Sequence, residues 1–148
     1  MRKEFVIRGK TVSGDTEVLN FGKYKAGTAY RMTEFSLYPS TSISANNDAL
    51  YGTVTAGKTG VSPIDPDFDN EGLIASTCFI TSSGWGGNQP FNGTIINDTF
   101  MITQNLILMV QNASGGEPIN WQCKFESVKM TGPEEAAVNY KQFAISDV

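Results

Sequence analysis

Apolar and polar residues alternate with a period of two in several runs along the chain. The clearest run covers residues 119–126, with its apolar positions at Ile119, Trp121, Cys123 and Phe125. Such alternation is typical of a strand with one face on the core and the other in solvent. In the run 28–38 the apolar phase changes, which predicts a β-bulge near Thr33 and Glu34.

Turn residues separate eight such runs, and together they predict an all-β chain. The expected strands cover residues 3–9, 16–21, 28–38, 49–56, 72–82, 93–103, 105–112 and 119–130. Short antiparallel strands at this spacing are typical of a sandwich or a jelly roll. We therefore predict a single-domain, jelly-roll-like antiparallel β-sandwich over residues 1–148, with at most one short helix near the C-terminus.

The expected helix follows the last strand. Thr131 and Glu134 have the spacing of a capping box, and Pro133 falls in the first turn. We expect a helical turn or short helix at this point. The chain is then expected to end in an extended conformation through Phe143 and Ile145.

Composition and charge argue against several classes of function. Ser, Thr and Asn are abundant (12, 14 and 11 residues), while His is absent and the net charge is −4. Without His the chain lacks the usual general base and the commonest metal ligand. A negative net charge argues against nucleic acid or an anionic membrane as the partner. We expect no enzyme, no cofactor and no small-molecule substrate.

Two short stretches resemble ligand motifs. Gly52–Thr59 matches the Walker A pattern, but its middle has strand propensity and two prolines follow, so we expect a strand and a glycine turn. Asp65, Asp67 and Asp69 alternate as in the first half of a calcium loop. The loop positions that would need Gly and Glu hold Asn70 and Ser76, so we expect a solvated acidic loop and leave calcium as the alternative.

Cys78 and Cys123 are the two cysteines of the chain. Cys123 shares the apolar phase of its strand, which favours two buried free thiols over one disulfide. The N-terminus has no apolar segment of the signal-peptide kind, so we expect synthesis in a cytoplasm. The run Leu106–Val110 is too short to span a membrane.

Trp85 lies among glycines and Phe91 follows a proline, so both aromatics are expected on loops. An aromatic side chain on a loop can serve as a sugar platform or as an interface anchor. It can equally fold back over the end of the sandwich. Both interpretations stay open at this point.

Several blocks of sequence resemble a group of small virion-associated proteins of marine tailed phages. The similar blocks are residues 10–21, 29–31, 34–35, 37–41, 96–100, 104–108 and 120–123. The resemblance covers nearly all of the chain. It implies a β-sandwich structural component of the virion: a capsid decoration (cement) protein that binds and stabilises the shell without catalysis.

The resemblance also implies partners. These are the major capsid protein or other virion proteins. We also expect the protein to form a homotrimer or homodimer, because these assemblies match the symmetry axes of a shell. We expect either the N-terminal strand, to which Phe5 and Ile7 belong, or the C-terminal segment to dock on a neighbour by strand addition. Trp85 and Phe91 are the other candidate partner-binding residues. The alternative is a tail-fibre or spike-associated module that recognises host surface glycan through such loop aromatics.

Overall fold

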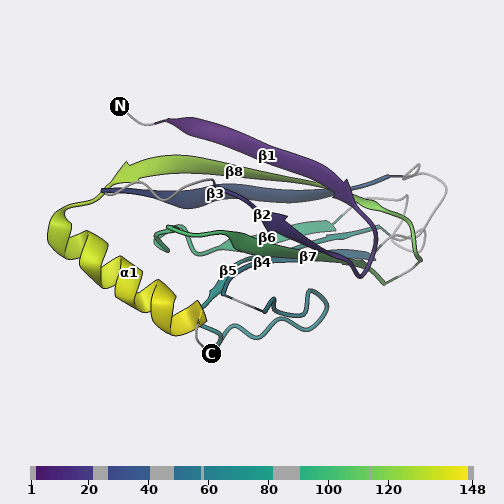
Figure 1. Ribbon diagram of the computed structural model, residues 1–148. Helices are drawn as coiled ribbons and strands as arrows, with labels where there is room; N and C mark the ends of the chain where they lie inside the picture. The colour runs from purple at the N-terminus through teal and green to yellow at the C-terminus, as the bar shows by residue number, and fades with distance from the viewer. Residues whose placement is uncertain are drawn as a thin grey trace.

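The computed structural model of the protein describes residues 3–21, 27–40, 49–57, 59–81, 91–113 and 115–146. These residues form eight strands and one helix (Figure 1). The elements are β1 (Glu4–Thr11), β2 (Thr16–Leu19), β3 (Thr28–Pro39), β4 (Ala49–Ala56), β5 (Leu73–Ile80), β6 (Phe91–Ile96), β7 (Leu106–Asn112), β8 (Ile119–Lys129) and α1 (Gly132–Ser146).

The strands form two sheets that pack face to face. One has three strands in the order β1-β8-β3, and the other has five in the order β2-β7-β4-β5-β6. Every pairing of strands is antiparallel. Figure 1 shows the two layers, with α1 leaving β8 and running along one end of the sandwich. The predicted all-β sandwich is therefore confirmed.

Three of the strand pairs are those of a jelly roll, but β6 pairs with β5 and not with β3. β1 pairs with β8, β2 with β7 and β4 with β5, as if one long hairpin had been wrapped around the core. β6 pairs with β5 and so joins the five-stranded sheet. It also lies against β3, where the Thr94 hydroxyl donates to the Phe35 carbonyl at 3.3 Å.

The core lies between the two sheets and consists of the inward positions of the alternating strands, together with Phe100 and Ile102 from the connection between β6 and β7. Its large, fully buried side chains include Phe125, Met32, Leu50, Ile74, Ile102, Leu106, Leu108 and Ile119. Phe125 stacks on Phe5 at 5.5 Å between ring centroids, and Phe21 meets it edge-on at 4.9 Å. Aromatic pairs at these distances add to the stabilisation from burial alone.

The bulge in β3 is confirmed, because the register against β8 shifts between Met32 and Glu34. The expected strand 93–103 is wrong in its second half, since β6 ends at Ile96. The cause is a turn in which the Asn97 side-chain oxygen accepts hydrogen bonds from the amide and the hydroxyl of Thr99, at 3.3 and 2.7 Å.

The predicted C-terminal helix is confirmed as α1, but the extended end through Phe143 and Ile145 is wrong. The helix continues to Ser146 because no Pro or Gly follows Pro133 to stop it. Thr131 caps the start of the helix, since its hydroxyl accepts from the Glu134 amide at 3.4 Å.

Residues 59–72 fold over the outer face of the five-stranded sheet, and we call them the covering loop. The Thr53 hydroxyl donates to the Val61 carbonyl at 2.6 Å and ties the loop to β4. Gly60 lies against the Met109 side chain, where an added Cβ would collide with the sulfur. The stretch that matches Walker A runs through β4 up to Ala56, so the expected strand is confirmed there.

Candidate interaction site

Four exposed apolar side chains gather where the covering loop faces β5 and β6. Ile64 and Phe68 come from the loop, and Phe91 and Ile95 come from β6; each is between 43% and 61% exposed. They line a cleft of about 420 Å³, whose lining also includes Tyr51, Pro63, Pro66, Ser76, Thr77, Cys78, Gly93 and Thr94. We call the four exposed side chains the apolar patch.

The local sequence explains how the patch is built. Proline cannot donate to a strand ladder, so Pro63 and Pro66 keep the covering loop from becoming another strand of the sheet. Alternation along β6 places Phe91 and Ile95 on the same face of the strand. Gly93 lies between them, and an added Cβ there would come within 3.3 Å of the Phe91 ring. The glycine thus leaves the space that this ring occupies.

The covering loop also carries negative charge next to the patch residues Ile64 and Phe68 in the sequence. Asp65, Asp67 and Asp69 are exposed and alternate along the loop with its apolar residues. The Asp69 amide donates to the Asp67 carboxylate at 3.0 Å, which is an Asx turn. Among the described residues, which include these three, no group of His, Cys, Asp or Glu could hold a metal ion. The carboxylates form an acidic rim beside the patch.

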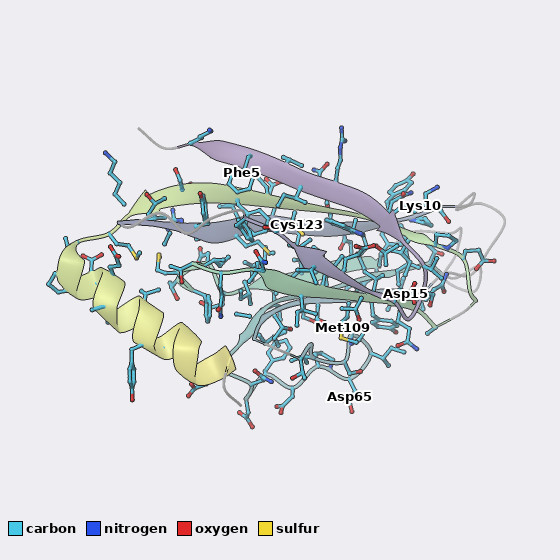
Figure 2. All side chains as sticks on the ribbon, in the orientation of Figure 1. Phe5, Lys10, Asp15, Asp65, Met109 and Cys123 are labelled. Carbon is cyan, nitrogen blue, oxygen red and sulfur yellow. The ribbon has the colours of Figure 1, made fainter. Side chains whose placement is uncertain are left out.

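One of the two cysteines lies in the cleft. Cys78 is half-buried and Cys123 is buried in the core, and both are free thiols (Figure 2 labels Cys123). The prediction of free thiols is confirmed, although Cys78 is less buried than expected. Burial raises the pKa of the Cys123 thiol, because a thiolate would lose its hydration there.

Of the four predicted partner-binding residues, the structure describes three, and these lie on two different strands. Phe5 and Ile7 lie on β1, half-buried against the core of their own domain, and β1 is paired along its length with β8 (Figure 2). Phe91 belongs to the apolar patch, and Trp85 lies outside the described residues. A partner-binding role for the four stays a prediction.

Reasoning from the sequence missed Ile64, Phe68 and Ile95. A usable signal was present in the loop, because apolar residues interleaved with Pro and Asp cannot all turn inward. For Ile95 the signal was weaker, because Ile96 follows it and the two isoleucines lie on opposite faces of the strand. The sequence therefore does not show which face is exposed. Which of these two isoleucines faces solvent depends on the pairing with β5.

No protein-family model matches the chain, and no curated protein is significantly similar to it. The one helix in the described part of the chain is neither long nor apolar enough to cross a membrane.

Proposed function

We propose that this protein is a capsid decoration protein of a tailed phage, which binds the assembled shell through the apolar patch and performs no catalysis. The observation that carries the proposal is the patch itself. Large apolar side chains grouped on one surface are a mark of an interaction site. The sequence resemblance described above supplies the virion as the setting, while the jelly roll, which also occurs in viral capsid and lectin domains, is only an analogy.

The chemistry of the patch describes the partner surface. Phe68 and Phe91 are the large side chains of the patch, and aromatic side chains of this kind are the common anchors of interfaces. The acidic rim adds a charge preference, because Asp65 and Asp67 would repel an acidic partner. The proposed partner is therefore a shell protein that presents an apolar protrusion flanked by Lys or Arg. A trimer or dimer of the decoration protein at a symmetry axis is part of the same proposal.

Binding to shells tests this proposal. Shells of the encoding phage that lack the protein are mixed with the purified full chain and sedimented, and the bound fraction is measured. The double variant Phe68→Ser with Phe91→Ser should bind at least roughly tenfold more weakly, because both anchors are lost. Val18→Ser is the matched control, since Val18 is 62% exposed on β2, at the opposite edge of the same sheet.

The shell binding of the variants can be compared only when each variant is folded. All three substitutions are at exposed positions, so urea unfolding should show little change in stability. Loss of binding by the double variant with normal binding by Val18→Ser supports the proposal. Normal binding by the double variant contradicts it, because the shell would then be held by another surface.

A further inference from the structure

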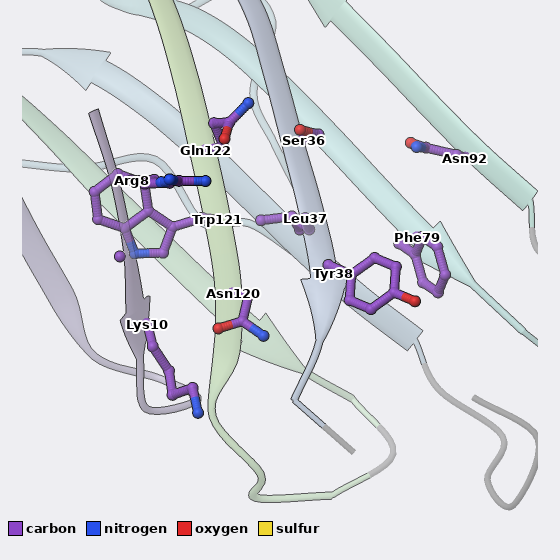
Figure 3. Close-up of a pocket in the computed structure, with 11 residues that line it drawn as sticks. Arg8, Lys10, Ser36, Leu37, Tyr38, Phe79, Asn92, Asn120, Trp121 and Gln122 are labelled. Carbon is purple, nitrogen blue, oxygen red and sulfur yellow. The ribbon is translucent and has the colours of Figure 1, made fainter. Parts of the chain in front are cut away.

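A second concave surface lies on the other layer of the sandwich, across β3. It has a volume of about 790 Å³, and Figure 3 shows side chains from β1, β8 and β3 around it. The side chains that line it include Arg8, Lys10, Ser36, Tyr38, Asn120 and Gln122. We call this surface the polar groove. Its volume is in the range of pockets that hold small organic ligands.

The strand register arranges these six side chains in two rows. Arg8 and Ser36 flank Gln122 in one row, on β1, β3 and β8 respectively. Lys10 and Tyr38 flank Asn120 in the same way in the next row. All six point away from the core, because the residues between them along the strands face inward. Three neighbouring strands span about 10 Å, so the array matches an extended ligand rather than a single ion.

Most hydrogen-bonding groups of the array are unused. Within the part of the chain that the structure describes, Arg8, Ser36 and Gln122 make no side-chain hydrogen bond or ion pair. Asn120 uses its amide nitrogen in a long bond of 3.5 Å to the Pro39 carbonyl, which leaves its side-chain oxygen as an acceptor. Hydroxyl, amide and guanidinium groups therefore converge on the groove without partners.

An aromatic ring forms one wall of the groove. Tyr38 is 57% exposed, and its ring contacts that of Phe79 at 6.1 Å between centroids. Figure 3 shows the two rings side by side, with Asn120 and Gln122 on the other side of Tyr38. A ring that is already held in place loses little entropy when a ligand packs against it.

The charge of the groove is opposite to that of the protein. The chain carries a net charge of −4, but the groove contains Arg8 and Lys10, and no described residue that lines it carries a carboxylate. A guanidinium group can bind a carboxylate through two parallel hydrogen bonds. The ligand is therefore expected to carry negative charge as well as many hydroxyl groups.

We propose that the polar groove binds an acidic saccharide, a chain of sugars that carry carboxylates. Arg8 binds a carboxylate, Tyr38 packs against the face of a sugar ring, and Gln122 and Asn120 bind hydroxyls. This site is additional to the shell-binding function proposed above and does not depend on it. Phe91 and Ile95 face the apolar patch, whereas Asn92, on the opposite face of β6, lines the groove, so both surfaces can be occupied together.

The test measures saccharide binding by the purified full chain. An array presents hexamers of galacturonate, glucuronate, mannuronate and guluronate beside neutral hexamers of galactose, glucose and mannose. The best hexauronate is then titrated calorimetrically into the wild type and into Arg8→Gln and Tyr38→Ala. Each variant should bind the hexauronate at least roughly tenfold more weakly, because it has lost one charge-assisted or stacking contact. Lys129→Gln is the control, because Lys129 is exposed on β8 and does not line the groove.

Binding of a hexauronate that falls in Arg8→Gln and Tyr38→Ala but not in Lys129→Gln supports the proposal. Three results would overturn it: no hexauronate binds, neutral hexamers bind as tightly, or Lys129→Gln weakens binding as much as Arg8→Gln. The double variant of the apolar patch separates the two proposals. It should keep saccharide binding even where it loses the shell, so either site can fail without the other.

Discussion

At the residue scale, a few side chains decide how closely the strands pack. Gly9 on β1 is paired with Trp121 on β8, and an added Cβ at Gly9 would lie 2.9 Å from the indole ring. The space left by the glycine lets the buried Trp121 N–H donate to the Thr11 hydroxyl at 2.9 Å. A buried polar group is stable only when it has such a partner.

Phenylalanine occurs both in the core and on the surface, so the effects of its substitution on stability can be compared directly. Phe125 is fully buried, whereas Phe68 is 56% exposed. Phe125→Ala should lower the free energy of unfolding by about 3–5 kcal/mol, because it removes buried surface and leaves a cavity. Phe68→Ala should change it by less than about 0.5 kcal/mol. Urea unfolding measures both, and equal effects would contradict the assignment of core and surface.

Cys123 should make stability fall at alkaline pH. Its folded-state pKa is raised by burial, so the unfolded chain loses the thiol proton first, above about pH 8.5. The native state then binds more protons than the unfolded state, and the free energy of unfolding declines as pH rises. Relative to Cys123→Ala, the wild type should lose roughly 2 kcal/mol between pH 8.5 and pH 10. A difference between the two proteins that does not vary with pH would contradict this account.

At the scale of elements, local signals predicted which segments form strands but not how loops lie on them. The alternation in β8 and the phase change in β3 depend on neighbouring residues, so the strand and the bulge could both be predicted. The position of the covering loop depends on contacts with β4, which precedes it, and with β7, which is distant in sequence. The composition of the loop indicated that some of its apolar residues stay exposed, but the position of Ile64 and Phe68 beside β6, and with it the apolar patch, could not be predicted.

The contact between the covering loop and β7 can be tested by a double-mutant cycle. Gly60→Ala should destabilise the protein by about 1–3 kcal/mol, because the new methyl group collides with the Met109 side chain. In a Met109→Ala background, which removes the colliding atoms, the same change should cost distinctly less. Urea unfolding of the four proteins gives the coupling. Strict additivity would mean that the loop does not rest on Met109.

At the scale of the whole molecule, the jelly roll brings together residues that the sequence keeps apart. Arg8 and Gln122 are paired neighbours only because β1 closes against β8, at opposite ends of the chain. The class of fold and its jelly-roll-like character could be predicted from eight short alternating strands, but the position of β6 beside β5 and the polar groove could not. Which strands pair with one another depends on packing over the whole domain, and a local sequence pattern does not encode that packing.

The central claim is that the protein decorates the phage shell, and its copy number in particles tests that claim most directly. Quantitative mass spectrometry of gradient-purified particles would give the number of copies relative to the major shell protein. We expect a ratio comparable to that of the shell protein itself. A few copies, as in a tail ring or a set of fibres, or complete absence from the particle would contradict the claim.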